Sequence, residues 1–288
     1  MVYKTVIVVS KEDTASCNIK THLLEKGDWT EYKQYDSEPS YTLGDCVMIS
    51  IDDIHLYYDN VDRKVEEQLG FKPELIIYAS RHRSESKLKT LTLHPLGNYT
   101  EAKFGGIPGR LVPTAPRKMT QALRTLTRNG SGLEHKISYE ATHHGPYLET
   151  PTFFIEIGSD ETAWVEQEPA DAIARTLLAV LSEPADEKDR LAIGVGGGHY
   201  VPRLTEVALE YHIAFGHMIP TYALDMPKEM FSAAISATPG VECVYFHKKF
   251  MKKAKYREIK TWMEENTSLL VVDSKSLEKI GDRLDIDS

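Results

Sequence analysis

Three short polar signatures contain most of the residues that could do chemistry. They are SRHRSES at 80–86, EATHHGP at 140–146 and GVGGGHYVPR at 194–203, and each follows an apolar run. Each signature therefore places histidine where a strand should end. In open α/β sheets, ligands bind outside the carboxyl ends of the strands, so we expect the three signatures to converge on one site. This pattern favours an enzyme.

The second signature groups a carboxylate with two imidazoles. Glu140, His143 and His144 lie within five positions, and a Gly-Pro pair then forces a turn. Such a group can bind zinc, or it can pair a general base with an orienting partner. Adjacent side chains on extended backbone point to opposite sides, so we expect one histidine to serve a metal and the other the substrate, unless the turn bends sharply. The alternative is that both histidines only form hydrogen bonds within the core.

The third signature combines three glycines with a histidine. Gly196, Gly197 and Gly198 follow a predicted strand and precede His199 and a predicted helix. Glycines allow the backbone to approach an anion closely, and a helix N-terminus favours negative charge. The spacing matches neither a Walker loop nor the dinucleotide fingerprint. A tight turn without a ligand is the alternative.

The first signature is rich in arginine. Arg81 and Arg83 flank His82, and His94 follows in LTLHPLGN. Paired arginines suit phosphate or carboxylate recognition, and Arg110 could add to them. His217 in GHMIP could also face a substrate. We expect the remaining histidines to lie on the surface or in the core: His22, His55, His135, His212 and His247.

Charge is distributed unevenly along the chain. The whole chain has a net charge of −9, yet residues 81–128 contain ten basic and two acidic residues, and a second basic cluster lies at 248–260. Such surfaces can hold a phosphate backbone while the acidic remainder limits indiscriminate binding. We therefore predict that 81–128 is a basic, substrate-facing segment. An ordinary solvated surface is the alternative.

The hydrophobic pattern predicts an α/β fold with a mixed, largely parallel sheet flanked by helices, because strand-like runs alternate with helical ones. The predicted strands are Thr5–Val9, Cys46–Ile51, Leu75–Ala79, Ile137–Tyr139, Thr152–Ile157, Leu191–Val195 and Cys243–Phe246. Predicted helices cover 116–127, 170–183 and 203–215, the last ending at Gly216. Pro and Gly residues predict a long ordered loop over 93–117. No linker divides residues 1–288, so we expect one compact unit, or two closely packed lobes.

Composition excludes several classes of protein. The N-terminal apolar run is short and contains Lys4, which indicates a first strand rather than a signal peptide, and no stretch approaches a membrane span. We expect a cytoplasmic protein without membrane or DNA partners. Three widely spaced cysteines argue against disulfides and against a thiolate zinc site. No heptad seam is visible, and we expect a monomer.

The motifs together resemble a known family. SRH at 80–82, LTLHPLGN at 91–98, GGIPGRLVP at 105–113, EATHHGP, FIEIGS at 154–159, GGGHYVPR at 196–203 and GHMIPTYAL at 216–224 are similar, in this order, to the archaeal and plant type of D-aminoacyl-tRNA deacylase. The resemblance runs from about Lys4 to His247. It excludes residues 25–45 and the tail after 262. It implies a zinc-dependent hydrolase that removes D-amino acids from tRNA, on a phosphorylase- or hydrolase-like α/β fold.

With that resemblance, residue roles can be assigned as expectations. His82, His143 and His199 are the expected metal ligands, and Glu140 and Glu156 act as ligand or general base. His94 and His144 are second choices for a catalytic role. Expected contacts with tRNA come from Arg81, Arg83, Lys103, Arg110, Arg203 and the glycines at 196–198, whose amides could also stabilise an oxyanion.

Two other classes of function stay open. A zinc-dependent peptidase or amidase of the same fold would use the same histidines and carboxylates, but a peptide substrate does not need the basic segment. A non-catalytic tRNA-binding module would keep the basic segment but would not need the EATHHGP cluster. Metal removal would leave its tRNA binding unchanged.

Overall fold

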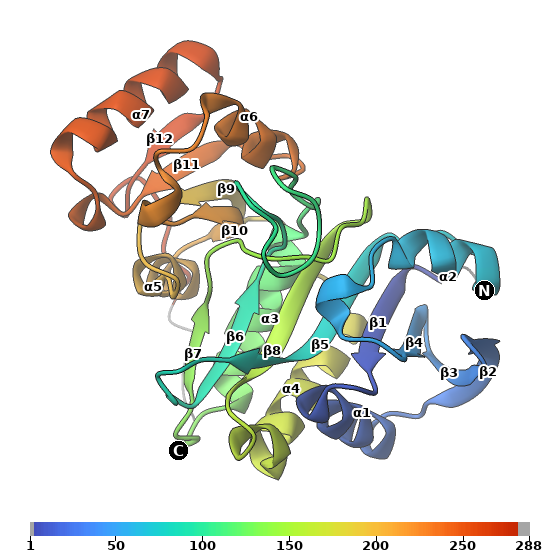
Figure 1. Ribbon diagram of the computed structural model, residues 1–288. Coiled ribbons are helices and arrows are strands. Elements are labelled where there is room, and N and C mark those ends of the chain that lie inside the picture. The colour runs from blue at the N-terminus through green and yellow to red at the C-terminus, as the bar shows by residue number, and fades with distance from the viewer. Residues whose placement is uncertain (1–2, 282–288) are drawn as a thin grey trace.

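The computed structural model describes residues 3–281 and contains two sheets (Figure 1). The larger has eight strands in the order β2-β3-β4-β1-β5-β8-β6-β7. The strands are β1 (Thr5–Ser10), β2 (Thr30–Tyr35), β3 (Glu38–Leu43), β4 (Cys46–Ile51), β5 (Leu75–Arg83), β6 (Thr90–His94), β7 (Lys136–Tyr139) and β8 (Thr152–Ser159). Strands β4, β1, β5 and β8 are parallel, whereas β6 runs antiparallel to β8 and parallel to β7. The predicted mixed, largely parallel sheet is confirmed.

The smaller sheet has four parallel strands in the order β10-β9-β11-β12. They are β9 (Arg190–Val195), β10 (Ile213–Ile219), β11 (Cys243–Phe246) and β12 (Leu270–Val272). Figure 1 shows this sheet beside the β6–β7 edge of the larger one. A single apolar cluster contains residues of both sheets, among them Leu93 and Phe215, so the two sheets share a core.

Helices cover both sheets. One face of the larger sheet packs against α1 (Thr14–Lys26), α3 (Pro116–Asn129) and α4 (Gln167–Ser182), and the other face packs against α2 (Val61–Leu69) and part of the 93–117 loop. The smaller sheet lies between α5 (Pro202–Glu210) with α3 on one face and α6 (Lys228–Ser236) with α7 (Lys253–Asn266) on the other. Short 3-10 turns are η1 (His55–Tyr57), η2 (Ala163–Val165), η3 (Thr221–Ala223) and η4 (Lys248–Phe250).

One predicted helix is wrong in its second half. The helix predicted over 203–215 ends at Glu210, and residues 213–219 form strand β10. All seven residues of β10 are buried beside β9, and this pairing overrides a helical spacing that continued by chance to Phe215. Gly216 is therefore a strand residue rather than a helix stop. A side chain there would overlap Thr238 and Thr114, so glycine permits close packing.

The two segments outside the family resemblance, 25–45 and the tail after 262, add strands to the two sheets. Residues 25–45 contain the β2–β3 hairpin at the far edge of the larger sheet, and the tail after 262 contains β12. Cys17, Cys46 and Cys243 are free thiols, as expected. Among residues 3–281, no helix has the length and apolar character needed to cross a membrane.

Candidate active site

Register places three of the expected site residues on one face of the larger sheet. Gly158 of β8 lies opposite His82 of β5, and Phe154 of β8 lies opposite His94 of β6. Because alternate residues of a strand share a face, His82, Glu156 and His94 all project from the same side of three neighbouring strands. A side chain at position 158 would overlap the Thr90 hydroxyl and press on the His82 ring, which explains the glycine in FIEIGS.

This register corrects the expectation that the signatures meet at one carboxyl edge. Strands β6 and β7 run opposite to β5 and β8, so their carboxyl ends point the other way. The signatures converge instead above the face of the sheet. Glu140 follows β7 and donates its amide hydrogen to the Leu93 carbonyl at 2.9 Å, which fixes its position next to His94.

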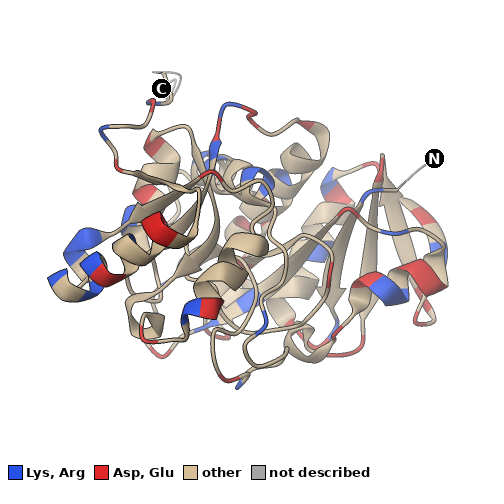
Figure 2. Cartoon of the chain, turned by 90° about the horizontal axis from the view of Figure 1, so that it is seen from above, with Lys and Arg blue, Asp and Glu red and all other residues tan. Residues whose placement is uncertain are grey.

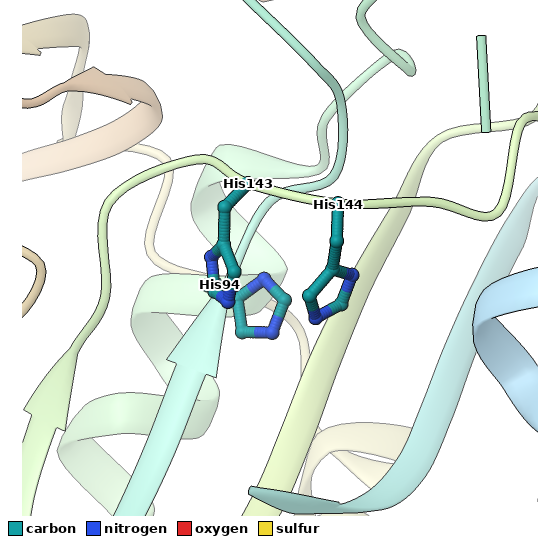
Figure 3. A group of neighbouring side chains, drawn as sticks. All are labelled: His94, His143 and His144. Carbon is teal, nitrogen blue, oxygen red and sulfur yellow. The ribbon is translucent and has the colours of Figure 1, made fainter. Parts of the chain in front are cut away.

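A sharp bend brings His143 and His144 to the same side. His144 has a φ of +44°, in the left-handed region, and the two ring centroids are 4.2 Å apart. Figure 3 shows both rings descending from one loop toward His94 at the end of β6. The sequence analysis allowed for a sharp bend between the two histidines, and the structure has this bend.

His199 reaches the cluster from the smaller sheet. Its carbonyl accepts a hydrogen bond from the Ala141 amide at 2.8 Å, and Glu140 forms an isolated β-bridge with Tyr200. Gly196 and Gly197 have φ of +100° and +104° and donate their amides to Ile219 and to the Thr221 hydroxyl. Those two amides are therefore occupied, and only Gly198 of the three remains for an oxyanion.

Glu140 is the centre of the cluster. Its Oε1 lies 3.2 Å from His82 Nδ1, and its Oε2 lies 3.1 Å from His199 Nε2 and 3.5 Å from His143 Nε2. The second carboxylate, Glu156, has Oε2 at 3.5 Å from His82 Nδ1 and 3.6 Å from His94 Nε2. Both carboxylates are buried.

The hydrogen bonds of two histidines orient their free nitrogens. His143 Nδ1 is 2.8 Å from the Ala141 carbonyl and His144 Nδ1 is 2.7 Å from the Gly145 carbonyl. A carbonyl only accepts, so both Nδ1 atoms carry hydrogen and both Nε2 atoms present a lone pair. The His143 lone pair therefore faces Glu140 Oε2, and both oxygens of Glu140 lack a hydrogen-bond partner. His82, Glu140 and His199 form a group whose ligand atoms lie close enough together to hold a metal ion.

The local electrostatics divide the imidazoles into two classes. Burial lowers the pKa of His82 and of His94, but the Glu156 and Glu140 carboxylates together outweigh it, so the pKa of both histidines is raised. Burial and neighbouring imidazoles lower the pKa of His143 far below its usual value and that of His144 to about 3. Burial would raise the pKa of Glu140 and Glu156, yet the adjacent histidines hold both low. The carboxylates are thus charged, while His143 and His144 are neutral.

A cavity of about 640 Å³ opens beside the cluster. Its walls are segment 97–104, residues 142–144, His199 and segment 222–227. Phe104 is 60% exposed and Tyr222 is 67% exposed, so two aromatic rings are accessible at this cavity. Lys103 also lines it.

Comparison with known proteins identifies the family. A sequence model of the D-aminoacyl-tRNA deacylase family matches residues 69–271. The D-aminoacyl-tRNA deacylase of Pyrococcus abyssi is 42% identical over 83% of this chain and 89% of its own length. This chain belongs to the D-aminoacyl-tRNA deacylase family. The family resemblance of the motifs is confirmed.

Other relatives extend the match to nearly the whole chain. The D-aminoacyl-tRNA deacylase of Thermococcus onnurineus is 40% identical over 90% of this chain and 96% of its own length, and that of Methanosarcina acetivorans is 36% identical over 96% and 95%. A crystal structure of a conserved protein of unknown function has a TM-score of 0.89 and 29% identity, covering 96% of this chain and 99% of that one. The similarity to these relatives therefore extends beyond the part of the chain that contains the motifs.

Several expected tRNA contacts of this deacylase-family protein lie away from the cavity. Arg81 stacks 5.0 Å from the Trp164 ring, and Arg83 pairs with Glu161. Arg203 donates to Tyr245, Glu206 and Ser274. Arg110 is exposed on the 93–117 loop. The described residues that line the cavity include Lys103 but none of these arginines.

The basic segment 81–128 does not form one surface. Arg124 of α3 makes a bidentate ion pair with buried Asp189 at 2.7 and 3.0 Å, and Lys118 donates to the Val180 carbonyl at 2.7 Å. Lys89 pairs with Glu134 and Glu166. Figure 2 shows basic positions interspersed with acidic ones across the molecule. Much of this segment's charge is therefore neutralised by the rest of the fold.

Two contacts were not anticipated from the sequence. The Tyr200 hydroxyl lies 2.9 Å from His82 Nε2, so a residue noted only as the neighbour of His199 touches the cluster. His217 does not reach the cavity; it is fully buried and hydrogen-bonded to Thr142, next to His143. Tyr200 is next to His199 in the sequence, and this adjacency could have indicated that it lies near the cluster. The sequence has no comparable signal for the contact between His217 and Thr142.

Proposed function

We propose that this protein hydrolyses the ester between a D-amino acid and the 3′ end of tRNA, with a bound zinc ion. The observation that carries the proposal is Glu140, a buried carboxylate with no hydrogen-bond partner, surrounded by nitrogens of His82, His143 and His199 beside a cavity. Family membership supports the substrate. Such a substrate also implies a cytoplasmic protein.

The donor set suits zinc. Zinc takes imidazole nitrogen and carboxylate oxygen, and metal-binding histidines commonly donate their other N–H to a backbone carbonyl. His143 and His144 both have this arrangement, and unpartnered Glu140 and Glu156 oxygens face the same space. The adjacent histidines stabilise both buried carboxylates, and a cation beside their unpartnered oxygens would add to this stabilisation. We assign the metal site to two adjoining groups, His82 with Glu140 and His199, and His143 with His94 and His144; the ligand atoms within each group lie within 4.8 Å of one another.

A bound zinc ion would supply Lewis acidity, which makes water nucleophilic at neutral pH and polarises an ester carbonyl. The protein's own groups supply the remaining steps. Glu156 can accept the proton that the attacking water loses, and His94, with Nε2 3.6 Å from Glu156 Oε2, can return a proton to the 3′ oxygen that leaves. His144 is neutral and presents a lone pair at Nε2, so it can orient water. The Gly198 amide can donate to the developing oxyanion.

The cavity suits the aminoacylated 3′ end. Exposed Phe104 and Tyr222 can stack on an adenine base, and Lys103 can pair with a phosphate. The ester would then lie over the histidines at the cavity wall, near His143 and His199. Binding the nucleotide by its base and phosphate leaves the amino-acid side chain to occupy the rest of the volume.

The test is release of amino acid from tRNA charged with D-tyrosine and, in parallel, with L-tyrosine. Each reaction is run after chelation and again after zinc is added back. We expect release from the D-ester that chelation abolishes and zinc restores. Turnover that survives complete metal removal would refute the zinc assignment. Intact tRNA binding without any release would instead indicate a binding module.

Two variants separate metal loss from general damage. His143→Ala and Glu140→Gln should each lose bound zinc, measured by elemental analysis, together with deacylation. His22→Ala, on α1 outside the cluster, is the matched control and should retain both. If either site variant kept its zinc and its activity, the ligand assignment would be wrong.

A further inference from the structure

A basic segment on the smaller sheet has no place in the site described above. Residues 248–260, here the η4–α7 segment, contain seven basic residues and one acidic residue. Lys248, Lys249, Lys252 and Lys253 are all exposed. Phe250, between them, is 55% exposed. The segment therefore presents a dense positive charge to solvent around an accessible aromatic ring.

Most of this charge is not neutralised by the fold. Lys255 pairs with Asp225 and Glu258, and Lys260 pairs with Glu264. Among residues 3–281, the other five basic side chains of the segment form no ion pair: Lys248, Lys249, Lys252, Lys253 and Arg257. This differs from segment 81–128, where acidic partners and carbonyls take up much of the charge.

The unpaired charges continue along α7. Lys253 and Arg257 are four residues apart, which places them on the same side of the helix. The first turn of α7 contains no acidic residue, so its partial positive charge adds to that of the lysines. With 14 residues the helix is about 21 Å long, enough to follow several consecutive phosphates of one strand.

Two contacts join this segment to the cavity wall. The Thr221 hydroxyl donates to the Phe250 carbonyl at 3.0 Å, and Lys255 Nζ lies 2.8 Å from Asp225, which lines the cavity. Thr221 also accepts the Gly197 amide, two residues before His199. The unpaired lysines therefore begin next to the segment that borders the site. Figure 1 shows α7 on the outer side of the smaller sheet, and Figure 2 shows basic residues along it.

We propose that the η4–α7 segment binds the phosphates of the tRNA acceptor stem while the 3′ end occupies the cavity. The proposal rests on the proposed function for its choice of polyanion. Phosphate contacts position a nucleic acid without reading its sequence, so this segment would hold a stem by its backbone alone. Phe250 can stack on an unpaired base near the end of the stem.

The test uses the triple variant Lys249→Ala, Lys252→Ala and Lys253→Ala. Its matched control removes three exposed lysines elsewhere, Lys72→Ala, Lys136→Ala and Lys188→Ala, none of which forms an ion pair among residues 3–281. Binding of uncharged tRNA transcript is measured by fluorescence anisotropy at several salt concentrations. Each lost phosphate contact should weaken binding roughly fivefold at 0.15 M salt. It should also reduce the slope of log K against log salt concentration by about 1.

If all three lysines contact phosphates, we expect the site triple to bind tRNA about a hundredfold more weakly, with a flatter salt dependence, and the control to bind normally. Lys→Arg changes at the same three positions should restore binding. Equal binding by the site triple, the control and the unaltered protein would overturn the proposal. This binding assay decides the matter even if no deacylation is found.

A kinetic comparison separates this inference from the proposed function. The site triple should raise KM for D-tyrosyl-tRNA with little change in kcat. Its hydrolysis of D-tyrosyl-adenosine, which has no stem, should be unchanged. A comparable loss on both substrates would show that the lysines act on the reaction centre and not on the stem. Failure of the unaltered protein on both substrates would refute only the proposed function.

Discussion

His217 is predicted to make the stability of the protein steeply dependent on pH. It is fully buried in β10, where its Nε2 donates to the Val112 carbonyl at 3.0 Å and its Nδ1 accepts from the Thr142 hydroxyl at 3.0 Å. Burial lowers the pKa of His217 from 6.5 to about 3. A protonated ring could no longer accept from the Thr142 hydroxyl, which would have to turn and become the acceptor, and its charge would be buried without a carboxylate partner.

The sign and size of the effect follow from this pKa. Below pH 6.5 the unfolded chain protonates His217, but the folded protein does so only near pH 3. The free energy of unfolding therefore decreases as pH falls through that window, by about 1.4 kcal/mol per pH unit from this residue alone. His217→Gln keeps a polar side chain with donor and acceptor atoms but removes the titration. Its pH slope should be shallower by about 1.4 kcal/mol per unit between pH 4 and 6.

The assay is urea unfolding of both proteins at half-unit pH steps, with chelator present so that metal does not contribute. The slope is the decisive quantity, because a general loss of packing in His217→Gln would shift the free energy of unfolding equally at every pH. Identical slopes would refute the reasoning. Thr142→Val provides a second check, since its cost should be smaller in the His217→Gln background, where the bond is already altered.

Three further predictions test other parts of the molecule. Phe104→Ala and Tyr222→Ala should each raise KM for D-tyrosyl-tRNA by roughly fivefold to a hundredfold, because a base stacked on an aromatic ring gains about 1–3 kcal/mol; an unchanged KM would exclude stacking. Arg124→Ala leaves Asp189 buried without its partner and should destabilise the fold by about 3–5 kcal/mol, seen as a lower Tm, while tRNA binding at a temperature where it is folded stays normal. Adding zinc at 100 times its Kd to the chelated protein should stabilise it by about 2.7 kcal/mol, and His143→Ala should abolish that increase in thermal-shift measurements.

The core strands could be predicted because their signal is local. The strands predicted at Cys46–Ile51 and Cys243–Phe246 match β4 and β11, since buried parallel strands are continuous apolar runs between polar turns. The edge strand β2 and its neighbour β3 were not predicted. Their sequences, TEYKQY and EPSYTL, are mostly polar and partly exposed, so their pairing comes from the hairpin and from β4 rather than from burial.

The identity of the site residues could be predicted better than their arrangement. Histidine and glutamate types in short motifs indicated Glu140, His143 and His199, and the structure brings these together. Their common location depends on the antiparallel direction of β6, which leaves no local signal, and on the left-handed backbone of His144, for which the sequence offers only the Gly-Pro turn that follows. The left-handed φ of His144 becomes visible only in the folded backbone.

Charge counted along the chain does not show which basic residues find partners in the fold. Segment 81–128 is strongly basic in sequence, but Arg124 meets Asp189, 65 residues away, and Lys118 meets carbonyls at the end of α4. Only folding reveals such partners. In the η4–α7 segment, acidic groups reach two of the seven basic residues within the described chain, so a linear count and the folded surface agree.

The two sheets contribute different parts of the candidate site. The larger sheet supplies both carboxylates and His82, whereas the smaller supplies His199, the 222–227 wall of the cavity and the exposed lysines. The two are joined where the Ala141 amide meets the His199 carbonyl and the Thr142 amide meets the Met218 carbonyl. A metal held by Glu140 and His199 would therefore link the two sheets at the same place. Movement of the smaller sheet would then displace a metal ligand and the proposed tRNA surface together, so loss of metal should weaken the alignment of the stem as well as the chemistry at its end.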